Sequence, residues 1–353
     1  MSSTMIRAYN MKAVVIHQFV SDYDEVVVSE VEPPKQQDSV IIQVKAAGVN
    51  FVDTLYARGK HQNNRSLVRP PFTLGLEFAG TILSVPASAP ADFPFRAGDH
   101  VFGDGLGAYS EQVALSLTAA SQSLHLVPPT WSFADAAGLA ATLPVSYGAL
   151  IAQGGLKPGE TVLVLGAAGG LGVMAVQVAA TLGCRVIGVA AGAEKCAVVK
   201  SCGAEACVDY SVPSSAEWWM DVNTLTDGCG VDVVFDPIGM VEKSLKCLAH
   251  RGRILIVGFA ARDETSLEKV PMNRVLLKQA QLIGYRYGES SRRYPEEKAK
   301  LWKELQPFMR TIRATRASRP VAGLSCSPFM SHQKIVLGLD SGDVVPEVQQ
   351  VSS

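Results

Sequence analysis

The chain has 353 residues, 48% hydrophobic and 18% charged, a composition typical of a folded globular protein long enough for two domains of ordinary size. Its formal net charge of −1 argues against a nucleic-acid partner, because such proteins usually carry a basic surplus on one face. The sequence contains no run of about eighteen apolar residues, which a membrane-spanning helix would need. Residues 1–10 lack the apolar core of a signal peptide, so we expect a cytoplasmic protein and leave the role of this tail open.

The seven cysteines are odd in number and form no Cys-x-x-Cys pair of the zinc or redox kind. In a cytoplasmic protein, the pattern predicts reduced thiols rather than disulfides.

The first part of the chain is predicted to be mostly β. Short apolar or alternating runs are separated by turn residues, and we expect strands at 11–19, 25–31, 39–47, 78–85 and 100–103. These runs predict a first domain over 11–135.

From Phe133 onward, helical and strand-like segments alternate, which favours an α/β fold with a parallel sheet. Helices are expected at 134–150, 173–182 and, as a crossover, 241–250. Strands are expected at 162–165, 185–189, 231–235 and 254–257. This alternation predicts a doubly wound dinucleotide-binding domain over 136–280.

The run 161–172 reads as strand, glycine turn and helix, an arrangement that suits a diphosphate. Helix N-terminal N–H groups carry partial positive charge and face an anion that approaches only where side chains are absent. Gly169 and Gly172 hold the last two glycine positions of the dinucleotide fingerprint, and Ala167 stands at the first. We expect the cofactor to contact Ala168, Gly169, Gly170, Leu171 and Gly172. The alternative is an ordinary strand-to-helix turn.

The next strand ends in Ala190, Ala191 and Gly192, where an NAD-binding chain would place a carboxylate on the adenosine ribose. Without that carboxylate a 2′-phosphate is not repelled, and Lys195 is close enough to neutralise one. The pattern predicts NADPH, unless Lys195 is simply a solvated cation. The complete set of expected cofactor residues adds four outside the glycine turn and this loop: Tyr210, Gly258, Phe259 and Asn273.

Seven ordered stretches resemble the zinc-free quinone oxidoreductase branch of the medium-chain dehydrogenase/reductase superfamily. They are 46–54 (AAGVNFVDT), 75–80 (GLEFAG), 97–101 (AGDHV), 143–149 (LPVSYGA), 156–164 (LKPGETVLV), 166–172 (GAAGGLG) and 271–278 (PMNRVLLK). The resemblance implies a GroES-like β domain, a Rossmann domain, a return of residues 281–353 to the first domain, and an active-site cleft between the two.

The same resemblance implies that no metal takes part. Zinc-dependent relatives hold their catalytic metal with a cysteine at the position of Asn50 and a histidine at that of Leu76, and neither residue here is a plausible zinc ligand. Oxidising an alcohol without a Lewis acid is difficult, whereas reducing a conjugated carbonyl needs a positioned hydride donor and stabilisation of the developing anion. We therefore expect reduction of a quinone or an enone.

Three polar residues are the catalytic candidates: Asn50, Asp53 and Tyr56. Asn50 can offer its amide N–H to substrate oxygen or to nicotinamide, or it can be satisfied by backbone. Asp53 can serve chemistry or cap a helix. Relatives often place a tyrosine a few residues after the asparagine, but Leu55 stands at one such position with Tyr56 beside it, so solvent remains an alternative proton source.

Three further expectations concern the whole chain. The apolar run in 253–259 predicts an edge strand that pairs with its twofold mate in a homodimer. After Pro307 the sequence departs from the family pattern, and Pro346 would interrupt a strand ladder. Besides an NADPH-dependent reductase, including a trans-acting enoyl reductase, the chain remains compatible with a non-catalytic NADPH-binding structural or RNA-binding protein.

Overall fold

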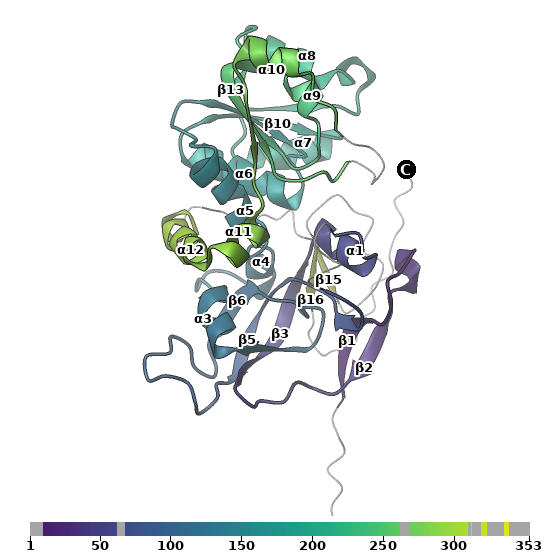
Figure 1. Cartoon of the computed structure of the whole chain (residues 1–353), viewed down its shortest axis with the longest axis vertical. Helices are drawn as coiled ribbons and strands as arrows, with labels where there is room; N and C mark the ends of the chain where they lie inside the picture. The colour runs from purple at the N-terminus through teal and green to yellow at the C-terminus, as the bar shows by residue number, and fades with distance from the viewer. Residues whose placement is uncertain are drawn as a thin grey trace, which may run out of the picture. The chain divides into compact units, whose positions relative to one another are not determined.

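The structure is a computed structural model that describes residues 10–61, 68–261, 268–309, 312, 319–322 and 335–338. Contacts divide the chain into unit 1, Met1–Ala141 with Ser318–Ser353, and unit 2, Thr142–Ala317. In Figure 1, unit 1 runs from purple to blue with two short yellow strands, and unit 2 runs from teal to yellow-green.

Unit 1 is built mainly from antiparallel strands. A small sheet has the order β2-β1-β4, and a seven-stranded sheet has the order β15-β16-β3-β5-β6-β8 with β7 also paired to β3. The bounds are β1 Met11–Ile16, β2 Val28–Val31, β3 Ser39–Val49, β4 Phe72–Thr73, β5 Glu77–Ser84, β6 His100–Asp104, β7 Gln112–Ser116, β8 Leu124–Leu126, β15 Arg319–Ala322 and β16 Ile335–Gly338. The helices are η1 Tyr23–Glu25, α1 Phe51–Ala57, α3 Leu117–Ser123 and α4 Phe133–Ala137.

The core of unit 1 lies against β3, whose β-branched residues are buried along most of its length. Ile42 and Val44 pack with Phe78 and Tyr109, all almost completely buried. Two predicted strands are shorter than expected. The first ends at Ile16, and the second begins at Val28 because the Glu25 carboxylate accepts the N–H groups of Ser21 and Asp22 and closes a turn.

Unit 2 contains one six-stranded parallel sheet of order β11-β10-β9-β12-β13-β14. Its strands are β9 Thr161–Leu165, β10 Arg185–Ala190, β11 Ala206–Asp209, β12 Val231–Asp236, β13 Leu248–Ile256 and β14 Gln281–Gly284. Its helices are α5 Leu143–Tyr147, η2 Gly148–Gln153, α6 Gly170–Thr181, α7 Ala193–Ser201, η3 Pro213–Ser215, α8 Trp218–Leu225, α9 Val241–Ser244, α10 Met272–Lys278, α11 Tyr287–Arg293 and α12 Pro295–Met309. No helix in the described ranges is long and apolar enough to span a bilayer.

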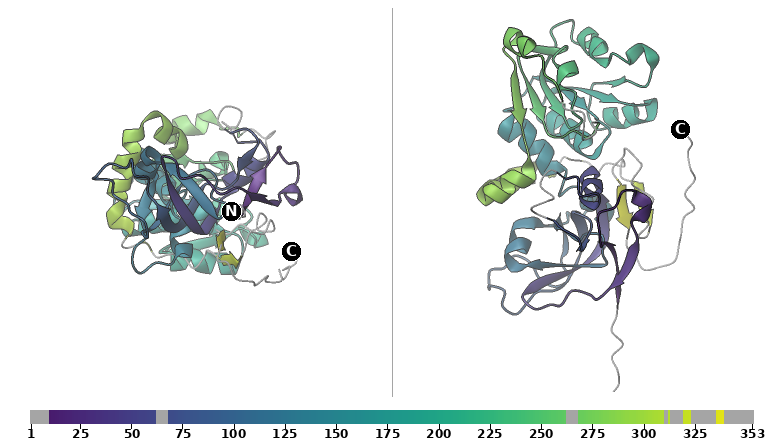
Figure 2. Two further views of the ribbon diagram at one scale, coloured as in Figure 1. Left: turned by 90° about the horizontal axis from the view of Figure 1, so that it is seen from below. Right: turned by 45° about the vertical axis from the view of Figure 1, so that its right-hand side comes forward.

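The centre of this sheet is apolar because helices cover both of its faces (Figure 2). Leu163, Val164, Ile187 and Val234 are completely buried. The strand order reverses between β9 and β12, which makes the carboxyl ends of these two strands the topological switch point where open α/β sheets bind ligands.

Two predicted helices are wrong in extent. The expected helix 134–150 is broken into α4, α5 and the π-helix η2, because Gly138 ends α4 and Pro144 starts a new first turn in α5. The expected crossover helix 241–250 is only α9, four residues long. The Val231 N–H donates to the Cys247 carbonyl, and β13 begins at the next residue, Leu248.

The predicted edge strand is also wrong. β13 lies between β12 and β14, with Arg253 opposite Gln281 and Ile256 opposite Gly284, so β14 forms the edge of the described sheet. Near the C-terminus, β16 pairs antiparallel with β3, Ile335 opposite Val49. The expected interruption at Pro346 and the tail 1–9 lie outside the described residues.

Candidate functional site

The glycine turn predicted from the sequence joins β9 to α6. Gly169 is the N-cap residue of α6 and has no side chain to cap it, so no cap side chain occupies the N–H groups of Gly170, Leu171 and Gly172 in the first turn. The Ser146 hydroxyl, on α5, donates to the Leu171 carbonyl at 2.9 Å and helps to fix this turn. Such a helix N-terminus at the switch point is suited to an anion.

The glycines of this turn differ in backbone conformation and in how closely other atoms approach them. Gly166 has φ +56° and makes the tight turn, which the sequence pattern had placed one residue later, where the buried Ala167 stands. A Cβ on Gly172 would lie 2.3 Å from the Gly166 carbonyl oxygen, so glycine is required there for close helix packing. Gly169 has φ −77° and ψ 168°, which any residue adopts.

Most of the other predicted cofactor residues follow the carboxyl ends of strands in the same parallel sheet. Gly192 follows β10, Tyr210 follows β11, and Gly258 with Phe259 follows β13. A Cβ on Gly258 would lie 2.7 Å from the Pro237 carbonyl oxygen in the loop after β12. Tyr210 and Phe259 are exposed, and Asn273 is exposed on α10. The fold therefore brings all of these residues except Asn273 to the ends of parallel strands.

The loop after β10 leads into α7 through Gly192, whose φ of +90° favours glycine. Lys195, in the first turn of α7, is half-buried and has no ion-pair partner among the residues that the structure describes. A carboxylate does lie beside this loop, although not from β10. Asp209, at the end of β11, accepts the Gly192 N–H at 2.7 Å. Asp209 was not among the residues predicted from the sequence, although its place at the end of the next strand was a usable signal.

In unit 1, Asn50 links the end of β3 to the start of α1. Its backbone N–H donates to the Asp53 carboxylate at 2.8 Å, and the same oxygen accepts the Tyr109 hydroxyl at 2.6 Å. Asp53 and Tyr109 are both buried. Burial, and next the charge of Asp53, raise the pKa of Tyr109 well above its ordinary value, so this phenol stays protonated and donates.

The Asn50 side chain is held on its other side by Glu77. Its amide nitrogen donates to Glu77 Oε1 at 2.8 Å and to the Gly48 carbonyl at 3.3 Å, and Glu77 Oε2 accepts the Ala141 N–H. Both amide N–H groups are therefore used inside the protein. A role of Asn50 toward a substrate or nicotinamide stays a prediction.

The tyrosine in this network is Tyr109 and not the predicted Tyr56. The Tyr56 ring stacks on His61 with centroids 4.5 Å apart and packs against the core of unit 1. Tyr109 lies in the loop between β6 and β7, distant in sequence from Asn50, and no local spacing indicated that the two residues meet. We name Asn50, Asp53, Tyr109 and Glu77 the Asn50 network.

Comparison with known proteins identifies the family. Residues 36–128 match the family described as alcohol dehydrogenase GroES-like domain, and residues 170–305 match zinc-binding dehydrogenase. The chain is 35% identical over 262 residues to a quinone oxidoreductase-like protein 2 homolog from Nematostella vectensis, covering 73% of this chain and 67% of that relative. The chain belongs to the quinone oxidoreductase group of the medium-chain dehydrogenase/reductase superfamily.

Solved structures agree with this assignment. A probable oxidoreductase from Mycobacterium abscessus is 31% identical with a TM-score of 0.76, covering 94% of this chain and all of that one. A mycobacterial protein solved as a complex with NADPH is 26% identical with a TM-score of 0.78, covering 93% of this chain and 100% of that one. The predicted family and the fold class, GroES-like domain plus Rossmann-like sheet, are confirmed, and the chain is an oxidoreductase of this superfamily.

The zinc of the superfamily's metal-dependent members does not fit the residues found here. At the two ligand positions, Leu76 has no donor atom and the Asn50 amide is bonded to Glu77. No group of three or more histidine, cysteine, aspartate or glutamate side chains in the described part of the chain is arranged to hold a metal ion.

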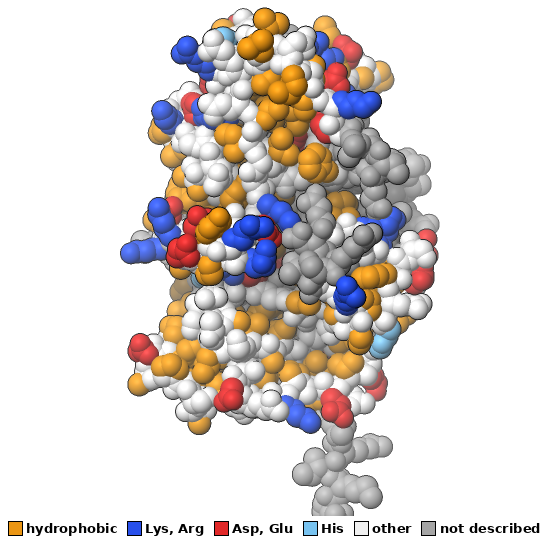
Figure 3. Space-filling view, viewed as in Figure 1, with side chains coloured by type: hydrophobic (Ala, Val, Ile, Leu, Met, Phe, Trp, Pro, Cys, Tyr) orange, Lys and Arg blue, Asp and Glu red, His pale blue; other side chains and the backbone are white. Residues whose placement is uncertain are grey.

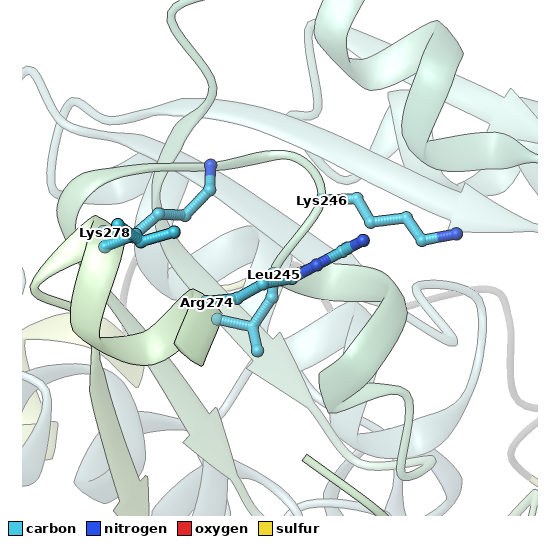
Figure 4. Close-up of a pocket in the computed structure, with 5 residues that line it drawn as sticks. Leu245, Lys246, Arg274 and Lys278 are labelled. Carbon is cyan, nitrogen blue, oxygen red and sulfur yellow. The ribbon is translucent and has the colours of Figure 1, made fainter. Parts of the chain in front are cut away.

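A basic cavity of about 470 Å³ lies elsewhere on unit 2, beside α10. Its lining is Leu245, Lys246, Arg274, Leu277 and Lys278. Lys246 and Arg274 extend in one direction, whereas Lys278 turns away from them and donates to the Leu248 carbonyl (Figure 4). Because its cations do not converge and none of the predicted cofactor residues lines it, we do not assign a ligand to this cavity.

Proposed function

We propose that the protein is an NADPH-dependent reductase that transfers a hydride to a quinone or an α,β-unsaturated carbonyl without a metal. The observation that carries this proposal is the N-terminus of α6, which offers N–H groups without a capping side chain, beneath a glycine turn at the switch point of the sheet. A similar chain solved with NADPH supports the choice of cofactor.

In this proposal the glycine turn holds the pyrophosphate through the N–H groups of Gly170, Leu171 and Gly172. Lys195 neutralises the 2′-phosphate, and Tyr210, Gly258 and Phe259 line the path of the cofactor at the ends of β11 and β13. The bound nicotinamide supplies the hydride.

Within the Asn50 network, we infer that Asp53 and Tyr109 act as positioning residues. Their buried hydrogen bond fixes the backbone of Asn50 at the start of α1, and Glu77 fixes its side chain. Because Asp53 is completely buried, it holds this loop and does not reach a substrate. The proton that completes the reaction then comes from solvent.

The experiment that tests this function is NADPH consumption with a panel of ortho-quinones, para-quinones and enones. We expect turnover with at least one class, and NADPH binding at least tenfold tighter than NADH. Lys195→Ala should reduce that preference about tenfold, as expected for loss of a charge-assisted contact of roughly 1.4 kcal/mol. Tight NADPH binding without turnover of any class would favour the non-catalytic alternative. Equal affinity for both dinucleotides would refute the assignment of NADPH.

A further inference from the structure

Asp209 reaches the adenosine-ribose end of the predicted cofactor site from a neighbouring strand. Residues Ala190 and Asp209 lie opposite each other in the parallel pair β10 and β11, so the two strands end together. Oδ1 of Asp209 accepts the Gly192 N–H at 2.7 Å, the Ser211 N–H at 3.0 Å and the Ser211 hydroxyl at 2.6 Å. A carboxylate is therefore fixed on the loop that follows β10.

The loop after β10 lies where a dinucleotide-binding sheet distinguishes NAD from NADP, so a carboxylate there affects cofactor choice. In a doubly wound sheet, the residue that ends the second strand meets the adenosine ribose, where a carboxylate favours the 2′-hydroxyl of NAD and a cation favours the 2′-phosphate of NADP. The chain has Ala190 at the end of β10 and Lys195 in the next helix turn, which favours the phosphate. Asp209 supplies the opposite charge at the same loop.

The remaining oxygen of Asp209 is directed to no hydrogen-bond donor among the described residues, and the side chain is half-buried. The Ser211 hydroxyl, followed by the Gly192 N–H, lowers the pKa of Asp209, so the group is charged at neutral pH. A ribose hydroxyl can donate to such an oxygen, whereas a phosphate is repelled by it.

We propose that Asp209 determines cofactor specificity by opposing Lys195: its carboxylate takes the place of the one missing from β10 and limits the preference for NADPH over NADH. This inference rests on the proposed function, because it concerns the same dinucleotide site. The preference of the wild type for NADPH is then the balance of two charges at one loop, and not the result of an absent carboxylate.

The experiment is titration of NADPH and NADH into the full chain with Asp209→Asn, Asp209→Ala and a matched control, Glu205→Gln. Asparagine keeps the oxygen that accepts the Gly192 N–H and removes only the charge. Glu205 precedes the same strand, roughly 13 Å away at 3.3 Å per residue, and its exposed carboxylate pairs with Arg185. Its substitution therefore makes the same change in net charge at the opposite end of β11.

The readout is the ratio of the two dissociation constants. We expect Asp209→Asn to raise the preference for NADPH about three- to tenfold. The charge that repels the 2′-phosphate is removed, and the neutral amide accepts the ribose hydroxyl of NADH more weakly than the carboxylate does. Asp209→Ala should also raise the ratio, even if both affinities fall through loss of the Gly192 contact. Glu205→Gln should leave the ratio unchanged.

A purely structural role for Asp209 would change both affinities equally, so an unchanged ratio in both Asp209 variants would overturn the inference. A lower ratio would overturn it as well, because Asp209 would then be helping to hold the phosphate. Failure of the wild type to bind either dinucleotide would instead refute the proposed function, and the two failures are therefore distinguishable.

Discussion

At the residue scale, the Asn50 network shows why an asparagine is needed between β3 and α1. Its amide faces a completely buried Glu77 carboxylate, and a Cβ on Gly48 would lie 2.2 Å from that carboxylate, so the space has no room for rearrangement. Asn50→Asp would place a second carboxyl group against Glu77. Two such groups cannot both be charged when buried, and the variant must take up a proton when it folds.

We expect Asn50→Asp to lower the free energy of unfolding by about 2 to 4 kcal/mol at pH 8. Because the folded variant binds the extra proton, the loss of stability caused by the substitution is smallest at low pH and grows as the pH rises above about 4, where carboxyl groups of the unfolded chain ionise. Urea unfolding at pH 5 and pH 8 measures the difference. Asn50→Ala is the control, since it removes the same hydrogen bond to Glu77 but adds no titrating group. An equal pH dependence in both variants would contradict this account.

At the element scale, the two glycines of the turn between β9 and α6 have separable roles. Gly169 has a backbone conformation open to any residue, so Gly169→Val should cost at most about 1 kcal/mol, the usual loss from a poor N-cap residue. Its added side chain nevertheless blocks the approach of a pyrophosphate to α6. Gly172 touches the backbone of Gly166 and Ala167, so Gly172→Val should force the helix from the turn and cost about 3 kcal/mol.

Thermal melting with and without NADPH separates these effects. Gly169→Val should melt close to the wild type and gain nothing from NADPH, whereas Gly172→Val should melt lower even without cofactor. If Gly169→Val keeps the full wild-type increment on adding NADPH, the turn is not the pyrophosphate site.

At the scale of the whole molecule, α10, the helix before the edge strand β14, exposes an apolar surface. On α10, Met272, Leu276 and Leu277 are 65%, 77% and 75% exposed, and apolar side chains gather on this face in Figure 3. Open sheet edges and exposed apolar patches favour association. We therefore expect a homodimer at micromolar concentration, and we expect the double variant Leu276→Glu, Leu277→Glu to be monomeric by light scattering.

The matched control for this prediction is Leu126→Glu, which changes a leucine of unit 1 that is 57% exposed. It should leave the dimer intact. A wild-type monomer, or a dimer indifferent to the α10 variant, would contradict the prediction.

Local patterns in the sequence were sufficient to predict the family, the two kinds of sheet and the glycine turn between β9 and α6. Each of these depends on short-range chemistry: runs of buried β-formers, glycines at fixed spacing, and a helix that starts without a capping side chain. The predictions of helix extent and of the edge strand failed because hydrogen bonds to residues distant in sequence overrode local propensity. The helix expected at 241–250 is cut short because Cys247 pairs with Val231, and the predicted edge strand is interior because the short β14 covers it.

The sequence alone therefore determined the family, the fold class and the position of the glycine turn between β9 and α6. Only the tertiary structure decided which side chains meet: Tyr109 with Asp53, Glu77 with Asn50, and Asp209 with Gly192. These pairs join residues on different strands, helices and loops, and no spacing along the chain encodes their contact. The physical reason is that strand order and register, set by burial of the whole sheet, bring distant carboxylates to particular N–H and O–H donors.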